Sequence, residues 1–310
     1  MEKVCVLMST YNGEKYLKKQ IESILNQKGV EVKLIVRDDG SSDNTIEILR
    51  NYAKSKKIFF YKGKNLGPAG SFMSLLNSDF VKLLMSQGVY IAFSDQDDIW
   101  KSNKLSRAIK ILKTPDYKNV PAIYTCNFQL INQSDDFIEN INHIVTTNFL
   151  DSLIISSCTG CTMVFNYNLY KELENVCPEN IYMHDDWIHK VCLALGGKVF
   201  FDRGARNVFY RQHENNVIGL KTRFFSKISS YLDFLTDTRY KDRMLNEYKD
   251  INKLYNSKIP SKNSSLIKEV LNYKNLGLIS RINFANKICK KAQIKSFTRD
   301  FRLAIFFKRY

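Results

Sequence analysis

The stretch FSDQDDIW (residues 93–100) places three carboxylates within four positions, directly after the apolar run VYIAF (residues 89–93). The apolar run predicts a short buried strand. Open α/β sheets bind their ligands at the carboxyl ends of parallel strands. Asp95 and Asp97 point the same way on an extended segment, so both can face one hard divalent cation and its phosphate oxygens. The alternative is a solvated acidic turn that caps the following helix.

The first 120 residues repeat one pattern, in which an apolar strand is followed by polar residues and a helix. Strands are predicted over residues 3–8, 32–36, 58–61 and 89–93. The first three end in STYNG (9–13), RDDGSSD (37–43) and NLGPAG (65–70). The spacing of the apolar residues in 17–25 predicts an amphipathic helix. Four such alternations predict a parallel, Rossmann-like α/β sheet.

The following hundred residues mix their elements. Strands are predicted over residues 122–130, 162–165, 199–201 and 208–210. A helix is predicted from His184 to Leu195, ended by the glycine pair 196–197. The segment RQHENN (211–216) predicts a polar loop.

Composition limits the class of protein. The 310 residues are 44% hydrophobic, which is enough for a sizeable core. No apolar run approaches the roughly 20 residues that span a bilayer, and the N-terminus does not resemble a signal peptide. Seven scattered cysteines predict free thiols and a cytoplasmic protein rather than a disulfide framework. Cys158 and Cys161 have CxxC spacing, but no second cysteine pair completes a zinc site.

Charge divides the chain in two. The net charge is +16, and residues 221–310 alone hold 21 Lys/Arg against 7 Asp/Glu. We therefore expect a near-neutral domain over residues 1–220 and a basic helical region over 221–310. A basic excess attracts nucleic acid and anionic lipid alike. The near-neutral front and the absence of any nucleic-acid-binding motif argue against nucleic acid as a partner.

Taken together, these segments resemble the family 2 glycosyltransferases with the GT-A fold, and most closely the rhamnosyltransferase-type subset of bacterial cell-surface polysaccharide synthesis. The resemblance covers residues 3–219, and DQDDIW and RQHxNNVxG are its most specific strings. The matching segments are STYNGEKYL (9–17), ILNQ (24–27), RDDGSSDNT (37–45), NLGPAGSF (65–72), FSDQDDIW (93–100), TGCTMVF (159–165), MHDDW (183–187) and YRQHENNVIG (210–219).

The resemblance implies roles on the donor side. The nucleotide-binding residues would be Ser9, Thr10, Tyr11, Asp39 and Asp95. An aspartate can accept a hydrogen bond from a pyrimidine N3–H beside a stacking tyrosine. The alternative for residues 38–41 is a turn with a helix cap.

The resemblance also implies a metal site. Asp97 would hold Mg²⁺ or Mn²⁺ on the diphosphate, with Asp95 as the second ligand. His213 is a further candidate for the metal or phosphate, and Arg211 is a weaker candidate for phosphate. The cation would neutralise charge on the departing nucleoside diphosphate.

Asp185 falls where the family places its general base, which deprotonates the acceptor hydroxyl. Asp186 is its rival, because successive helical residues point about 100° apart and only one can face the site. Alternatively, both acids stabilise the positive end of a helix. Further donor or acceptor contacts are expected from Gly67, Asp98, Trp100, Gly160, Trp187 and Arg211. For the two tryptophans, sugar stacking competes with core packing.

The predicted function is an inverting, metal-dependent transfer of a sugar, foremost L-rhamnose from dTDP-β-L-rhamnose, to a hydroxyl of a glycan or lipid-linked glycan. The alternatives are a family 2 transferase that uses a UDP-hexose or another dTDP-deoxysugar, and a sugar nucleotidyltransferase. The nucleotidyltransferase would need a glycine-rich basic loop after the first strand, where STYNGE (9–14) has one glycine and an acid. A non-catalytic sugar-nucleotide binder would not need Asp95, Asp97 and Asp185 together.

The end of the chain predicts membrane contact. Phe297, Phe301, Ile305 and Phe306 share one helical face, which Arg299, Arg302, Lys308 and Arg309 can flank. Such a helix can lie in the interface of an anionic membrane, which would place the protein peripherally at the inner face. The alternative is a helical subdomain that packs on the catalytic domain and keeps its lysines solvated.

Overall fold

The structure is a computed structural model that describes residues 1–310 except 55, 87, 156 and 214–241. The segment ENNVIG (214–219) and the first part of the predicted basic region therefore lie outside the described residues.

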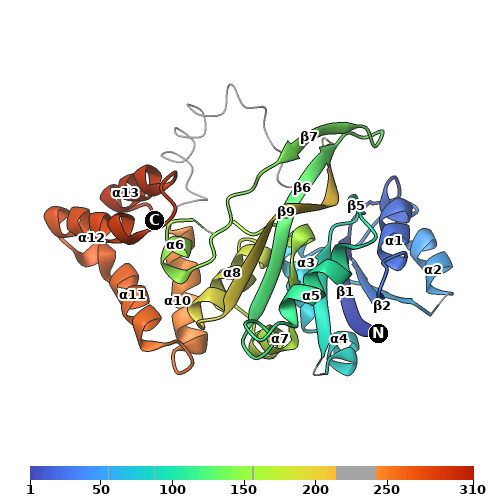
Figure 1. The fold of residues 1–310 in the computed structure, drawn as a ribbon, viewed down its shortest axis with the longest axis horizontal. Coiled ribbons are helices and arrows are strands. Elements are labelled where there is room, and N and C mark those ends of the chain that lie inside the picture. Colours follow the sequence, from blue (N-terminus) through green and yellow to red (C-terminus); the bar gives the residue numbers. More distant parts are fainter. Residues whose placement is uncertain (55, 87, 156, 214–241) are drawn as a thin grey trace.

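One mixed sheet forms the centre of the molecule (Figure 1). Its strand order is β3-β2-β1-β4-β8-β6-β9-β5, and β7 pairs with β6. The pairs β1–β2, β1–β4, β2–β3 and β6–β9 are parallel, and β8 lies antiparallel between β4 and β6. The strands are β1 (Glu2–Thr10), β2 (Val30–Asp38), β3 (Ile58–Lys62), β4 (Val89–Ser94), β5 (Ile99–Trp100), β6 (Ala122–Ile131), β7 (Phe137–Ile141), β8 (Val164–Phe165) and β9 (Lys198–Arg211).

Helices cover both faces of the sheet. They are α1 (Leu17–Leu25), α2 (Thr45–Ala53), α3 (Gly67–Leu76), α4 (Asp79–Leu84), α5 (Lys104–Leu112), α6 (Phe149–Ser152), α7 (Tyr167–Leu173) and α8 (His184–Ala194). Because strand side chains alternate between faces, β1 contributes side chains to two hydrophobic cores, one on each face of the sheet. Val4 and Val6 join the apolar residues of α1, α2 and α5, whereas Cys5 and Leu7 join those of α3, α7 and α8.

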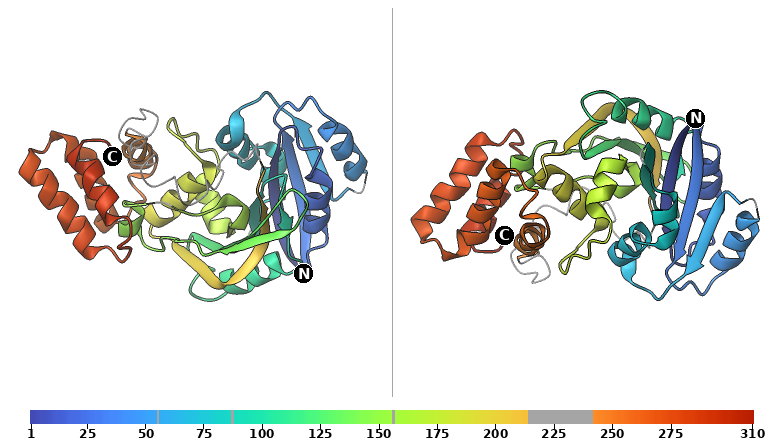
Figure 2. Two further views of the ribbon diagram at one scale, coloured as in Figure 1. Left: turned by 90° about the horizontal axis from the view of Figure 1, so that it is seen from above. Right: turned by 90° about the horizontal axis from the view of Figure 1, so that it is seen from below.

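Four helices end the chain: α10 (Arg243–Tyr255), α11 (Ser261–Asn272), α12 (Leu278–Lys291) and α13 (Thr298–Phe306). Leu245, Tyr248 and Ile251 of α10 belong to the same buried cluster as Ile188 and Val191 of α8. Helices α11 to α13 continue from α10 at the end of the molecule opposite β1–β3 (Figure 2). The C-terminal helices therefore share the core on one face of the sheet.

The predicted α/β fold with a parallel first half is confirmed, and its first four strands and the helix from His184 lie where expected. One prediction was wrong: the segments 199–201 and 208–210 are a single strand, β9. The polar residues between them look like a turn in the sequence. In the structure Asp202 and Arg206 stay paired with β6, and residues 203–205 form a bulge between them, where the register of β6 shifts on both sides of Asn127.

The predicted membrane-facing side of the last helix is only partly exposed, because Phe306 is exposed but two of its four apolar residues lie in the core. Phe301 and Ile305 are buried, and the ring of Phe301 lies 5.4 Å from that of Tyr310. The apolar side of α13 is used to pack on α12 and the chain end, because a nine-residue helix is stable only when that side is covered. In the described ranges, no helix is both long and apolar enough to cross a membrane.

Candidate active site

The polar ends of β1 and β4 are held together by Gln96. The amide N–H of Tyr11 donates to Gln96 Oε1 (2.8 Å), and Gln96 Nε2 donates to the Tyr11 carbonyl (3.0 Å). A Cβ on Gly13 would lie 2.3 Å from Gln96 Oε1, so the close approach requires glycine there. Sequence analysis did not single out Gln96. The sequence feature that could have identified Gln96 is its position between Asp95 and Asp97, together with the glycine in the loop after the first strand.

Asp38 and Asp39 have separate tasks at the end of β2. Asp38 accepts hydrogen bonds from the amides of Gly40 (3.1 Å) and Ser41 (3.0 Å) and from Thr10 Oγ1 (3.3 Å), and so shapes the turn. Asp39 points toward the loop before α3. Its carboxylate accepts from the amides of Leu66 and Gly67, each at 3.0 Å, and forms an ion pair with Arg37.

Asp39, a predicted nucleotide-binding residue, therefore organises the loop before α3 from inside the protein, with only 3% of its surface exposed. Gly67 has φ +69°, a left-handed backbone conformation that favours glycine. Ser9 lies nearby, with its Oγ 2.6 Å from Ser71 Oγ. Tyr11 is half exposed, which leaves its ring accessible for stacking on a base.

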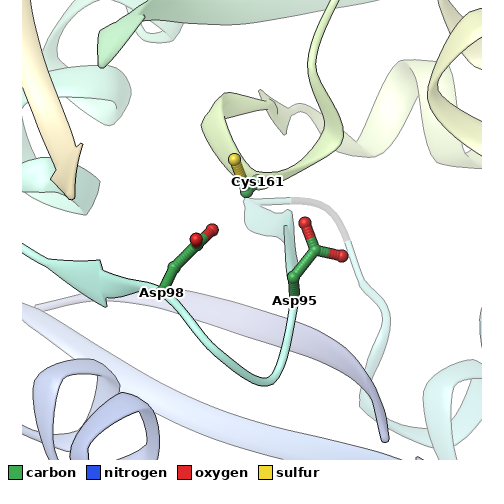
Figure 3. Close-up of side chains that lie close together, drawn as sticks. All are labelled: Asp95, Asp98 and Cys161. Carbon is green, nitrogen blue, oxygen red and sulfur yellow. The ribbon is translucent and has the colours of Figure 1, made fainter. Parts of the chain in front are cut away.

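The acidic stretch folds into a tight loop that brings carboxylates together (Figure 3). Asp95 and Asp98 face one another beneath Cys161, and one ligand atom from each residue lies within 4.8 Å of the other two. Burial raises the pKa of Asp95 to about 7, with smaller contributions from Asp97 and Asp185. Burial, Asp97 and Asp95 likewise raise the pKa of Asp98 well above its usual range.

Asp97 contacts His213 rather than the other two acids of its loop. His213 Nε2 lies 2.7 Å from Asp97 Oδ2, across 116 positions of the chain. The ring of His213 stacks on that of Tyr16, with centroids 5.2 Å apart. The structure thus brings two predicted metal-binding residues, Asp97 and His213, into direct contact.

This donor set fits a hard divalent cation. Carboxylate oxygens and a histidine are ligands that Mg²⁺ and Mn²⁺ accept. The mutual repulsion of Asp95, Asp97 and Asp98 is what a bound cation relieves. Burial raises the pKa of Cys161 well above its usual range, so its thiol stays protonated and is a poor ligand. Asp95 and Asp98, whose ligand atoms lie together, and Asp97, which pairs with His213, are the residues that would hold the ion.

Asp185 lies in the first turn of α8 and faces this acidic loop. Its Oδ2 accepts from the amide of Gly160 (2.7 Å), and its Oδ1 accepts from the amide of Asp186 (2.8 Å). Burial, and then the charge of Asp186, raise the pKa of Asp185 to about 6, although the backbone hydrogen bonds oppose the rise. Such a carboxylate suits a general base near neutral pH.

Asp186 turns to the other side of α8. Its Oδ2 lies 2.9 Å from Lys190 Nζ and 2.7 Å from Arg243 Nη2. The geometry thus separates the two rivals: Asp185 shares the electrostatic environment of Asp95, whereas Asp186 lies in an ion-pair network with the C-terminal helices.

Gly160 lies close to both residues at the start of α8. A Cβ on Gly160 would lie 2.8 Å from His184 Nε2 and 3.3 Å from Asp185 Oδ2. Its observed contact is the hydrogen bond to Asp185, which makes it a support for that carboxylate rather than a demonstrated acceptor contact.

The structure does not support sugar stacking by either tryptophan. Trp100 is 3% exposed and lies under Lys104, whose Nζ is 3.3 Å from the centre of the ring. Trp187 is fully buried in the core shared with α10. Their large apolar surfaces fill the core beside the acidic clusters, and this outweighs exposure to a ligand.

Comparison with known proteins places this geometry in a family. The model of the family "Glycosyl transferase family 2" matches residues 5–174, which carry the loops after β1, β2 and β4. This match covers more than half of the chain. The chain belongs to glycosyl transferase family 2.

Relatives of this family 2 glycosyltransferase include the dTDP-rhamnosyl transferase RfbG of Shigella flexneri. It is 28% identical over 234 residues, which cover 71% of this chain and 76% of RfbG. An uncharacterized glycosyltransferase of Rickettsia bellii is 32% identical over 190 residues, which cover 60% of this chain but only 26% of that protein.

The solved structure of S. aureus TarS residues 1–349 with UDP-GlcNAc is similar in fold. Its TM-score is 0.60 at 14% identity, over 98% of this chain and 89% of that one. At this identity the likeness supports the GT-A fold and no more.

Arg211 of this family 2 glycosyltransferase lies behind the acidic loop and not in contact with solvent. Its Nε donates to the Asp97 carbonyl (2.8 Å), its Nη1 donates to the Asn132 carbonyl (3.0 Å), and its guanidinium forms an ion pair with Asp135. Its backbone amide donates to Asp98 Oδ1 (3.2 Å). Arg211 is therefore a support of the loop, and the expected phosphate contact is not available to a fully buried side chain.

Replacing Arg211 tests this role. Arg211→Met removes the donor to the Asp97 carbonyl, one of the two donors to the Asn132 carbonyl, and one of the two cations that pair with Asp135. We expect a loss of about 2–4 kcal/mol in the free energy of unfolding, measured by urea denaturation. Arg203→Met, an exposed position on the same strand, is the control and should change stability by less than about 0.5 kcal/mol. Equal stability of the two variants would contradict the supporting role.

Proposed function

We propose that this enzyme transfers a sugar from a nucleoside diphosphate to an acceptor hydroxyl, with inversion at the anomeric carbon and with Mg²⁺ or Mn²⁺. The observation that carries the proposal is the convergence of two acidic clusters from distant parts of the chain. The loop of Asp95 and Asp97 lies close enough to Asp185 for the charge of Asp185 to raise the pKa of Asp95. Direct displacement needs a diphosphate-binding group and a base in one site.

The donor side is built from the ends of β1, β2 and β4. Tyr11 offers an exposed ring to the base, and Asp39 fixes the loop before α3. Asp95 and Asp97 lie next to where the diphosphate would bind, with His213 on Asp97. The divalent cation, when bound, neutralises the charge that develops on the leaving diphosphate.

The acceptor side depends on Asp185. Its carboxylate takes the proton of the acceptor hydroxyl, and the freed oxygen attacks the anomeric carbon. The new carbon–oxygen bond forms as the bond from that carbon to the diphosphate oxygen breaks, and the electron pair leaves with the nucleoside diphosphate. The Gly160 amide fixes the carboxylate from behind. A β-linked donor therefore yields an α-linked product.

The donor that we favour is dTDP-β-L-rhamnose, and the acceptor class is a glycan or lipid-linked glycan. Support comes from the relative in Shigella flexneri, which is described as a dTDP-rhamnosyl transferase and which matches this chain over most of both lengths. A UDP-hexose or another dTDP-deoxysugar is the alternative donor. A comparison of dTDP- and UDP-sugars as substrates decides between them.

Substitutions in the two acidic clusters test the reaction. Hydrolysis of each nucleotide sugar, and its transfer to a glycan acceptor, should require divalent metal. Asp97→Ala should lower both rates by about 10³-fold or more, since it removes a ligand of the ion that stabilises the leaving group. Asp185→Asn should lower transfer by about 10²–10⁴-fold, the usual contribution of a general base. Undiminished activity of Asp97→Ala, measured by release of nucleoside diphosphate, would refute the metal role.

The pH dependence of transfer tests the identity of the base. A base must be deprotonated to act, and the pKa of Asp185 is raised to about 6. The kcat for transfer should therefore be constant above about pH 7 and fall about tenfold per pH unit well below 6. The residual activity of Asp185→Asn should not show this fall at low pH. A wild-type profile that stays flat from pH 5 to pH 8 would contradict the assignment.

Membrane docking is the second part of the proposal, on a surface that shares only Phe306 with the apolar residues of the predicted face. Helices α12 and α13 run antiparallel, since Cys289 contacts Thr298 and Asn286 bonds to Arg302. The start of α12 therefore lies beside the end of α13. The exposed apolar residues gathered there, which we name the tip, are Leu278, Ile279, Ile282, Phe306 and Phe307.

The charge around the tip favours an anionic bilayer. Residues 242–310 hold 16 Lys/Arg against 5 Asp/Glu. Lys308 follows the tip directly and is exposed, as is Arg302 on α13. Exposed apolar side chains with flanking cations are the pattern that binds a lipid interface. Such docking would hold the enzyme at the inner face of the membrane, where lipid-linked acceptors are found.

Vesicle sedimentation tests the tip. The full-length protein should bind vesicles of phosphatidylglycerol and phosphatidylcholine and not vesicles of phosphatidylcholine alone. The double substitution Ile279→Ser and Phe307→Ser should lower the affinity about tenfold or more, because it removes two apolar side chains from the interface. Leu83→Ser, at an 84% exposed position of α4, is the control and should bind normally. Equal binding by the tip variant would exclude this surface.

A further inference from the structure

A buried ion network joins the helix of the proposed base to the C-terminal region. Lys190 of α8 is fully buried, and its Nζ contacts both Asp186 (2.9 Å) and Glu247 of α10. Arg243 of α10 reaches the same oxygen of Asp186 at 2.7 Å. Two carboxylates and two cations therefore balance one another, with Glu247 only 1% exposed. The mechanism proposed above uses none of these four residues.

The same helix also holds the segment that leads into α8. The amide of Asn180 donates to Asp250 Oδ2 (2.6 Å), and the amide of Tyr182 donates to Glu247 Oε1 (3.3 Å). The guanidinium carbon of Arg243 lies 3.3 Å from the centre of the Tyr182 ring. Asp250, Glu247 and Arg243 thus lie one helical turn apart along α10 and contact the chain at successive points before and within α8.

The first turn of α8 needs support from outside. Its N-cap residue, Met183, makes no side-chain capping hydrogen bond in the described structure. On the side of the sheet, His184 stacks on Phe72 (3.9 Å between ring centres) and Asp185 is held by the Gly160 amide, so the opposite side of the turn is the one that needs a further contact. The contacts of α10 with Asp186 and with the segment before it supply that support.

We propose that Arg243 and Glu247 are positioning residues for the transfer reaction: they hold the first turn of α8 so that Asp185 faces the acidic loop. This inference rests on the proposed function of Asp185. It makes the C-terminal region part of the catalytic machinery, although none of its described side chains has been placed at the donor or acceptor. It also gives Asp186 the task of receiving the contact from α10.

Steady-state kinetics of point variants test the inference. Arg243→Met removes one cation and leaves Asp186 paired with Lys190, so the protein should fold. We expect kcat for transfer to fall about tenfold, because displacements of about 1 Å at a reacting group cost up to about 10²-fold. The KM for the nucleotide sugar should stay within about twofold. Arg243→Lys should recover most of the loss, and Lys249→Met, an exposed position of α10, should match wild type.

A double-mutant cycle separates positioning from general stability. If Arg243 acts through Asp185, then Arg243→Met should cause no further loss of transfer in an Asp185→Asn background. Glu247→Gln, which keeps the shape of the side chain, is measured in the same cycle. Its result replaces that of Arg243→Met if the near-ultraviolet circular dichroism shows that Arg243→Met does not fold.

The outcomes distinguish the two levels of the account. If Asp185→Asn abolishes transfer while the Arg243 and Glu247 variants behave like Lys249→Met, the positioning role is overturned. The positioning role is also overturned if Arg243→Met lowers the rate of transfer by the same factor in the Asp185→Asn background as in the wild type. If Asp185→Asn itself transfers sugar at the wild-type rate, the proposed function of Asp185 fails first.

Discussion

The accumulation of carboxylates where β4 ends and α8 begins is the constraint on which the site depends. Asp95, Asp97 and Asp98 follow one strand, and Asp185 approaches from a helix 90 positions later. Burial and mutual repulsion raise the pKa of Asp95, Asp98 and Asp185. Charges of one sign that are brought this close must be compensated, or the loop would open. Cationic side chains supply that compensation behind the acidic loop and beside α8, and the front of the loop is left for a ligand.

The compensation is divided between two buried cationic groups. Arg211 lies behind the acidic loop and bonds to its backbone, so the loop keeps its shape without loss of the charge that faces the donor. On the other side, Lys190 and Arg243 neutralise Asp186, so that Asp185 remains the acid that faces the site. What remains uncompensated is the front of the loop, where the proposed divalent cation would supply positive charge.

Local sequence patterns made the loops predictable, whereas contacts between distant parts of the chain could not be predicted. The acidic loop, the turn at residues 38–41 and the helix start at His184 are encoded within a few residues each, and the structure forms all three. The hydrogen bonds of Gln96 span 85 positions, and the contact of Arg243 with Asp186 spans 57. Neither of these contacts produces a periodic pattern in the sequence. The tryptophans were ambiguous because an amphipathic ring suits a sugar and a core equally.

We propose that the acidic loop binds the cation and the diphosphate together, and calorimetric titration is the direct test of this. Titration of dTDP into the wild-type protein with Mn²⁺ should show an affinity at least about tenfold higher than titration with EDTA. The Asp97→Asn variant should lose this difference and keep the weaker binding that the base and ribose contacts provide. An affinity for dTDP that is the same with Mn²⁺ and with EDTA would contradict the account.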